Sequence, residues 1–142
     1  MTLILTALFV SPLGGAKGVS SRKIPCKVPA NAASCYWTHG RLGYANGTPA
    51  LRLWKIGTPR ILAIYSGPSA YNPAAADSDN GDNEDPELPA NVKSTFENSR
   101  SFDIGFPNRI FADFEVCPLE PEKLGVMQAS CVESAKNIVV EK

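Results

Sequence analysis

The dipeptide Asn46-Gly47 is the feature that most restricts how this chain folds. A type I′ turn needs a positive φ at both central positions, and Asn-Gly adopts that conformation readily. The flanking residues alternate between apolar and polar side chains, which indicates two antiparallel strands joined by a tight hairpin. A two-residue loop at this dipeptide pairs Arg41 with Arg52, and a four-residue loop keeps the same pairs. Either loop fixes which face of the hairpin each side chain occupies, whereas a three-residue loop shifts the pairs by one and mixes the faces.

This register sorts the hairpin side chains into two chemically different faces. One face carries Leu42, Leu51 and Leu53, and the other carries Trp37, His39, Arg41, Arg52, Trp54 and Ile56. In this register His39 lies opposite Trp54. A second turn around Gly57, closed by Lys55 and Arg60, extends the leucine face into a third strand that contains Leu62 and Ile64.

Another strand is predicted in the stretch RIFADFEVCPL, residues 109–119, where apolar side chains alternate with polar ones at period two. Residues 128–142 supply further β-prone material. Glycine and proline interrupt these stretches, and no amphipathic helix of useful length is evident. The pattern predicts an all-β fold, either a small sandwich or an open barrel built on an antiparallel meander. The length suits a single domain over residues 17–142.

The predicted hairpin places two arginines opposite each other, and like charges in that position destabilise a strand pair. The strand at 109–117 offers Asp113 and Glu115 on its polar side, so we expect one of them to compensate Arg41 and Arg52. With both acids in place, the cluster is mainly structural. Without them, the same face would bind an anion or an acidic polymer. The candidate binding residues are His39, Arg41, Arg52, Trp54, Asp113 and Glu115.

The chain has an even set of cysteines, at positions 26, 35, 117 and 131. Such a set in a short exported chain favours disulfides, and four cysteines allow three pairings. Cys117 ends one expected strand and Cys131 lies in the next, so we expect these two to be joined. Cys26 and Cys35 then pair by elimination. Zinc is the alternative, with His39 nearby, but no close C-x2-C pair is present. We expect no metal and no cofactor.

The N-terminal stretch MTLILTALFVSPLGGAKG fits a signal peptide, although a basic segment ahead of its apolar run is missing. The run from Leu3 to Val10 is too short to span a bilayer, and small residues before Lys17 offer a cleavage site. A plain N-terminal strand is the alternative. We therefore expect residues 1–16 to be removed and the protein to be secreted or periplasmic, with no membrane span.

Charge is distributed unevenly along the chain. Residues 1–76 contain eight Lys and Arg and no acid, whereas residues 77–142 contain six Lys and Arg and fourteen Asp and Glu. We expect the two parts to neutralise each other inside one fold. Residues 66–94 are rich in Pro, Gly, Asn, Asp and Ala, which predicts a long, mobile acidic loop.

The segments HGRLGYANGTPALRLWKIGTPRIL, DFEVCP and CVESA resemble a family of small exported bacterial proteins without an assigned function. The resemblance covers residues 35–65 and 109–135 and leaves out the acidic insert. It implies export and a compact domain, and it brings no reaction, ligand or catalytic residue.

Two classes of function fit these residues. The first is a non-catalytic binding domain for a protein, a glycan or an envelope polymer, since Trp and Arg are enriched at binding hot spots. The second is a hydrolase-type enzyme in which an acid orients His39 as a general base. No G-x-S-x-G, H-E-x-x-H or phosphate-binding glycine loop is present, so we favour binding. The net charge of zero and the expected export disfavour nucleic acid.

Geometry separates these two classes. An enzyme needs His39 bonded to a carboxylate in a concave pocket, whereas a binding domain needs a flatter face with exposed indoles.

Overall fold

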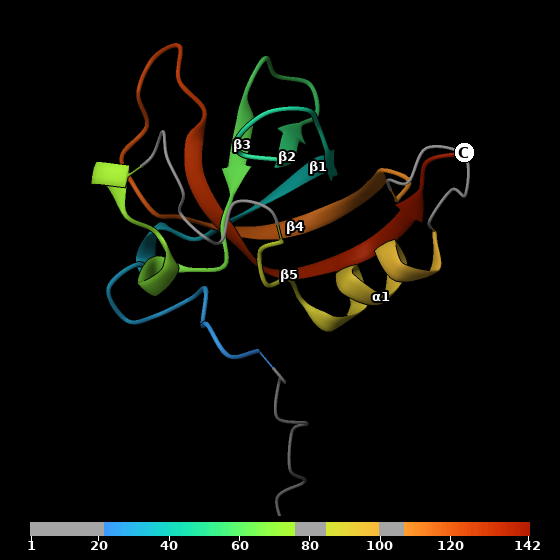
Figure 1. The fold of residues 1–142 in the computed structure, drawn as a ribbon, viewed down its shortest axis with the longest axis horizontal. Coiled ribbons are helices and arrows are strands. Elements are labelled where there is room, and N and C mark those ends of the chain that lie inside the picture. The colour runs from blue at the N-terminus through green and yellow to red at the C-terminus, as the bar shows by residue number, and fades with distance from the viewer. Residues whose placement is uncertain (1–21, 76–84, 100–106) are drawn as a thin grey trace, which may run out of the picture.

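The computed structural model describes residues 22–75, 85–99 and 107–142. The predicted signal peptide at 1–16 and the acidic cluster at 77–84 lie outside these residues. Within these residues the chain forms five strands and one α-helix, joined by loops that include three short 3-10 helices, arranged as in Figure 1. The elements are η1 (Ala32–Ser34), β1 (Tyr36–Tyr44), β2 (Leu51–Lys55), β3 (Ile61–Ile64), η2 (Pro68–Ala70), η3 (Pro73–Ala75), α1 (Ala90–Asn98), β4 (Ile110–Pro118) and β5 (Gln128–Val140).

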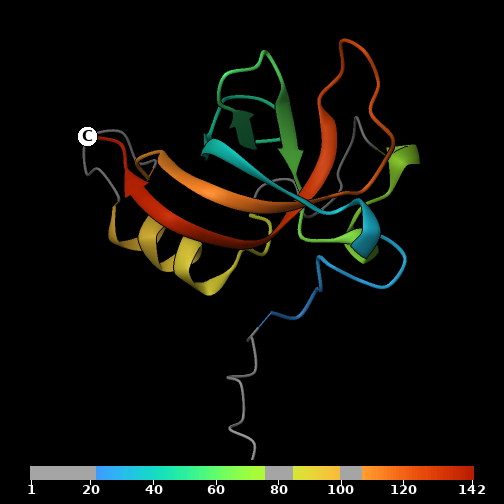
Figure 2. The ribbon, with the colours of Figure 1, turned by 180° about the vertical axis from the view of Figure 1, so that it is seen from behind.

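The strands form a closed barrel in the order β1-β2-β3-β5-β4, with β1 and β4 paired to complete the ring. All neighbours are antiparallel except β3 and β5, which run parallel. The long strands β4 and β5 lie side by side along one wall (Figures 1 and 2). The all-β prediction is confirmed, with a closed barrel.

The leucine face predicted for the meander lines the barrel interior. Its members and the apolar side of β4 are buried in one cluster: Leu42, Leu51, Leu53, Leu62, Ile64, Ile110, Ala112, Phe114 and Val116. Burial of one large aliphatic side chain stabilises a fold by about 1.5–3 kcal/mol, so this cluster is the main source of barrel stability. The β2–β3 register is also as predicted, since Leu53 lies opposite Leu62 and the N–H of Lys55 donates to the carbonyl of Arg60.

The loop between β1 and β2 is longer than the predicted two-residue turn. The N–H of Ala45 donates to the carbonyl of Ala50 at 2.8 Å, which leaves residues 46–49 as the loop. Gly47 adopts φ 95°, a conformation that glycine accepts without a steric penalty. The Asn-Gly dipeptide therefore marks the turn correctly, but the turn contains four residues.

Because the four-residue loop covers residues 46–49 and is not centred on Asn46-Gly47, the strand register differs from the predicted one by two residues. Arg41 lies opposite Trp54, and Arg52 lies opposite Gly43. The predicted Arg41–Arg52 and His39–Trp54 pairs are wrong. A two-residue shift keeps every side chain on its predicted face, because strand side chains alternate with period two. Arg41 and Arg52 thus share a face but do not oppose each other.

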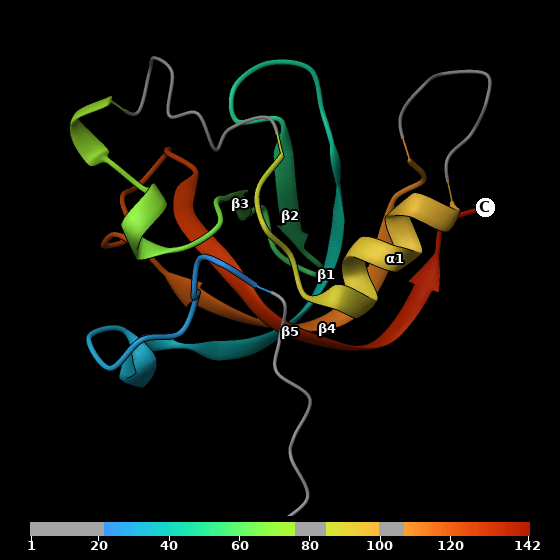
Figure 3. The same cartoon turned by 60° about the horizontal axis from the view of Figure 1, so that its bottom comes forward.

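Helix α1 corrects the prediction that residues 66–94 form one loop without a helix. Val92 and Phe96 of α1 are buried in the barrel core, and the ring of Phe96 lies 5.8 Å from that of Tyr44. Leu88 packs against the same cluster. Figure 3 shows α1 lying against β5. The helix therefore covers the end of the barrel at which β1 finishes.

Residues 22–35, which we call the lead-in segment, precede β1. Hydrogen bonds join this segment to residues near both ends of the 66–94 insert. The guanidinium of Arg22 donates to the carbonyl of Ser66. Oε2 of Glu87 accepts the N–H groups of Lys23 at 2.8 Å and Ile24 at 2.9 Å. The described parts of the 66–94 insert are therefore integrated into the fold.

The disulfides join Cys26 to Cys131 and Cys35 to Cys117, so the predicted pairing is wrong. Cys117 and Cys131 do lie opposite each other in the β4–β5 ladder, as adjacent strands require. Each sulfur instead bonds to the lead-in segment, which lies against these strands (Figure 3). The two bridges attach the lead-in to β4 and β5.

Candidate functional site: an aromatic–charged face

A continuous band of aromatic and charged side chains covers the outside of β2, β1, β4 and β5. Because β1 buries its even-numbered side chains, its odd-numbered ones point outward. The cross-strand neighbours of these residues complete the band. We call this surface the aromatic–charged face and define it by Trp37, His39, Arg41, Trp54, Phe111, Asp113, Lys136 and Glu141.

Asp113 is at the centre of the face and accepts two hydrogen bonds. Nδ2 of Asn137 donates to Oδ2 at 2.7 Å, and Nδ1 of His39 lies 3.0 Å from Oδ1. The hydrogen bonds from Asn137 and His39 hold the pKa of Asp113 below its ordinary value of 3.8. His39 and Asp113 are Cα partners across β1 and β4, so the barrel register itself brings them together.

Arg41 lies between two aromatic rings and is paired with the C-terminal segment. Its guanidinium carbon is 6.0 Å from the ring centroid of Trp54 and 5.9 Å from that of Phe111. Its Nη2 donates to both carboxylate oxygens of Glu141, at 2.8 and 3.1 Å. The compensating acid is therefore Glu141, and the predicted pairing of Arg41 with Asp113 or Glu115 is wrong.

Two of the predicted site residues lie at the margins of the face and form hydrogen bonds with residues outside it. Arg52 donates to the carbonyls of Pro49 and Asn46, and so it braces the hairpin loop. Glu115 accepts a 2.6 Å hydrogen bond from the ammonium of Lys27, which holds the pKa of this carboxyl below its usual value. The structure thus brings together four of the six predicted residues: His39, Arg41, Trp54 and Asp113.

The other members of the face were not among the predicted site residues. Trp37 and Phe111 stood on the expected outer faces of their strands, so period-two alternation could have included them. Lys136 and Glu141 come from the end of β5 or just beyond it, as does Asn137, which donates to Asp113, and no local pattern links them to β1. Their positions depend on the barrel closing.

Both tryptophans of the chain are half-exposed on this face, Trp37 at 48 % and Trp54 at 45 %. The ammonium of Lys136 lies 4.3 Å from the ring centroid of Trp37, a cation–π contact. The indole N–H of Trp54 donates to the carbonyl of Thr58 at 3.0 Å. These contacts orient two large rings at the surface, where a ligand can reach them.

Four salt bridges occur among the described residues, and each joins the basic first part of the chain to the acidic second part. They are Lys27–Glu115, His39–Asp113, Arg41–Glu141 and Arg60–Glu122, with the His39 pair charged only when the imidazole is protonated. The interpretation that the two parts neutralise each other inside one fold is confirmed for these residues.

The outside of β3 and the first half of β5 is covered. Ala63, Tyr65 and Ala129 are buried there beneath Tyr71 and two side chains of the β4–β5 connection, Leu119 and Met127. This region is therefore covered, whereas Trp37, His39 and Trp54 of the aromatic–charged face are exposed.

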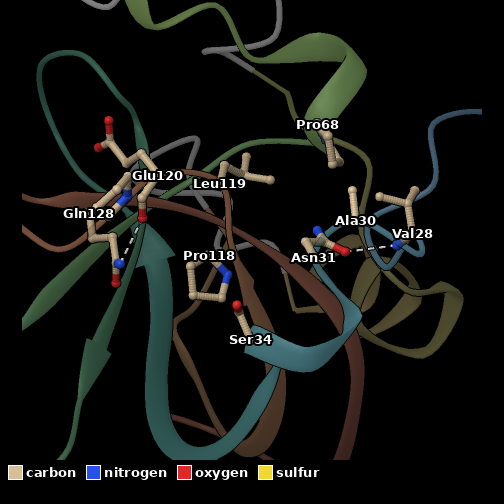
Figure 4. A pocket seen from close by; sticks show the side chains of 10 residues that line it. Val28, Ala30, Asn31, Ser34, Pro68, Pro118, Leu119, Glu120 and Gln128 are labelled. Carbon is tan, nitrogen blue, oxygen red and sulfur yellow. Dashed lines mark hydrogen bonds between the residues drawn. The ribbon is translucent and has the colours of Figure 1, made fainter.

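A separate pocket of about 530 Å³ lies beside the lead-in segment (Figure 4). Prolines 68, 118 and 121 contribute to its wall, and its single ionisable lining residue is Glu120. This carboxylate accepts hydrogen bonds from the hydroxyl of Tyr71 at 2.6 Å and the N–H of Ala129 at 3.0 Å. Burial and the bond to Glu120 raise the pKa of Tyr71. Glu120 thus serves as an internal brace, and His39 lies outside this pocket.

In the described parts of the chain, no helix combines the length and apolar character needed to cross a bilayer. The same residues contain no group of three or more His, Cys, Asp or Glu arranged to hold a metal ion.

Comparisons of the chain with protein-family models, with curated protein sequences and with solved structures found no match.

Proposed function

We propose that this chain is an exported, non-catalytic binding domain that contacts a component of the cell envelope or its surroundings through the aromatic–charged face. The observation that carries the proposal is the pair of half-exposed indoles beside Arg41 and Lys136. Large rings held at a surface by neighbouring side chains supply contact area at a low entropic cost, which is why Trp and Arg dominate binding hot spots.

The two disulfides support the export part of the proposal. Disulfides form and persist in oxidising compartments such as the periplasm and the extracellular space. Here they attach the lead-in segment to β4 and β5, the strands that carry Asp113 and Lys136.

A hydrolase-type enzyme is the second candidate, and the His39–Asp113 hydrogen bond favours it. A carboxylate that orients an imidazole is a common arrangement for a general base. The side chain of His39 is 54 % exposed on an open barrel wall, however, and the described pocket lies elsewhere. Catalytic sites usually exclude water from such a pair, so the geometry supports binding better.

The test is retention of a component from the envelope and culture fluid of the producing cell by the immobilised full chain. We expect the wild-type protein and a Leu124→Ala control to retain the same component. The double variant Trp37→Ala/Trp54→Ala should lose it. Leu124 is a suitable control because it is 98 % exposed and is not one of the residues that define the face.

Equal retention by the double variant would remove the aromatic–charged face from the proposal. Chemical breakdown of the retained component by the wild type, abolished by His39→Ala, would favour the hydrolase instead.

A further inference from the structure

We infer that the aromatic–charged face binds a linear, uncharged polysaccharide whose chain lies along β1. This inference rests on the proposed function and names its ligand class. It follows from the spacing of the two indoles, the balance of charge between them and the distribution of polar groups across the face.

The two indoles are spaced for a ligand longer than one or two sugar rings. Trp54 is the cross-strand partner of Arg41, and Arg41 lies four residues beyond Trp37 on β1. At a rise of about 3.3 Å per residue, the two ring positions are ~13 Å apart along the strand. An oligosaccharide must therefore contain several linked rings before it can contact both indoles at once.

The charges of the face compensate one another without a ligand. Arg41 is bonded to Glu141, and the ammonium of Lys136 lies near the carboxylate of Asp113. Two cations thus balance two anions when His39 is neutral. A strongly charged polymer would have to separate these pairs, whereas an uncharged one can add hydrogen bonds to them.

The apolar and polar parts of the face have the opposite arrangement to a typical protein–protein interface. Such an interface has an apolar centre and a polar rim. Here His39 and Asp113 occupy the centre, between Trp37 on one side and Trp54 on the other. Sugar rings match this arrangement, because they present apolar C–H faces for stacking and hydroxyls at their edges.

The centre of the face also retains groups that can bond to hydroxyls. Only Nδ1 of His39 contacts Asp113, so Nε2 is left to donate or accept at the exposed end of the ring. The imidazole is 54 % exposed at this position, which suits the middle of a long chain better than a small molecule held in a deep site.

The experiment uses the disulfide-bonded full chain with defined sugars. The probes are insoluble cellulose, chitin and xylan in depletion assays, and β-glucan, mannan, xylan and chitin oligosaccharides from the disaccharide to the hexasaccharide in calorimetry. Both tryptophans of the chain lie on the face, so intrinsic fluorescence reports binding there directly. Alginate and a single-stranded oligonucleotide serve as anionic comparisons, each measured at low and high salt.

We expect at least one neutral hexasaccharide to bind much more tightly than its disaccharide, because only the longer chain reaches both indoles. Trp37→Ala and Trp54→Ala should each weaken hexasaccharide binding about tenfold or more, which corresponds to ~1.4 kcal/mol. Trp37→Phe should restore part of the loss, and Leu124→Ala should change nothing. Circular dichroism and thermal unfolding show whether each variant keeps the fold.

Several results would overturn the inference. One is a failure of every neutral sugar to bind, and another is equal affinity for disaccharide and hexasaccharide. The others are an affinity that neither tryptophan substitution changes, and a preference for an anionic polymer that disappears at high salt. If no sugar binds while the envelope component is still lost from the double tryptophan variant, the proposed function stands and the ligand is not a polysaccharide. If both assays are insensitive to the tryptophans, both proposals fail.

Discussion

Asp113 links the strands β1, β4 and β5 through its two hydrogen bonds, and its ionisation should respond to both donors. We expect its pKa, measured by NMR titration of the side-chain carboxyl, to lie below 3.8 and to rise toward that value in Asn137→Ala. That change removes no charge, and because Asn137 adopts φ 56°, Asn137→Gly serves as a second variant that removes the hydrogen bond without straining the backbone. Asn98→Ala, at the exposed end of α1, is the matched control.

The lowered pKa of Asp113 also sets the sign of its effect on stability. Folding favours the charged carboxylate, so its contribution is fully present above the unfolded-state pKa near 3.8 and is lost as the pH falls through the lower folded value. Asp113→Asn should therefore lower the urea midpoint at pH 7 more than at pH 2. An equal loss at both pH values would contradict the assignment.

Arg41 and Glu141 form a partly buried ion pair between residues that are 100 positions apart in the sequence. A double-mutant cycle with alanine at both positions should give a coupling free energy of about 0.5–1 kcal/mol, typical of such pairs. The same cycle on Arg41 and Asp113 should give additive losses, because Asp113 bonds to His39 and Asn137 instead. Coupling in the second cycle alone would mean that the assignment of Glu141 is wrong.

At the scale of the element, α1 depends on the few apolar side chains that it inserts into the core. Phe96 is 6 % exposed and contacts the ring of Tyr44. Phe96→Ala should lower the free energy of unfolding by about 3 kcal/mol, because it leaves a cavity at the end of the barrel. Lys93→Ala, on the exposed side of the same helix, should change it by less than about 0.5 kcal/mol in the same urea titration. Similar losses for both would place α1 outside the cooperative core.

The helix illustrates what the sequence could have shown. Leu88, Val92 and Phe96 are spaced four residues apart, which is typical of one face of a helix. Pro89 lies at the start of this pattern, a position that favours the beginning of a helix. The polar composition of the surrounding insert obscured it. The barrel strands were easier to predict, because period two assigns a face to each side chain even when the register is wrong by two residues.

Other parts of the site could not be predicted from local patterns. The length of the β1–β2 loop decides the cross-strand partner of Arg41, and the Asn-Gly dipeptide is compatible with more than one length. Glu141 reaches Arg41 only because β5 pairs with β4 and β4 pairs with β1. The cysteine pairing likewise depends on where the lead-in segment lies, and that segment has no periodic pattern.

At the scale of the whole molecule, the disulfides join segments that are far apart in the sequence. Non-reducing peptide mapping should recover the Cys26–Cys131 and Cys35–Cys117 links, with separations of 105 and 82 residues. Loops of this size stabilise a fold by about 4–5 kcal/mol each in the chain-entropy model. Replacement of both members of one pair by serine should therefore lower the unfolding midpoint strongly. Recovery of a Cys117–Cys131 link would contradict this fold.

The closed barrel has a consequence for how copies of this domain behave when they are crowded. An open sheet edge presents unpaired N–H and C=O groups that another chain can extend into a larger sheet, a common route to fibrils. Each of the five described strands has a neighbour on both sides. Trp54 therefore lies on a strand segment that is paired on both sides, with β1 and with β3, and is displayed without an open sheet edge beside it. Any molecule that recognises this part of the face has to recognise its side chains, since the strands beside Trp54 already pair with one another.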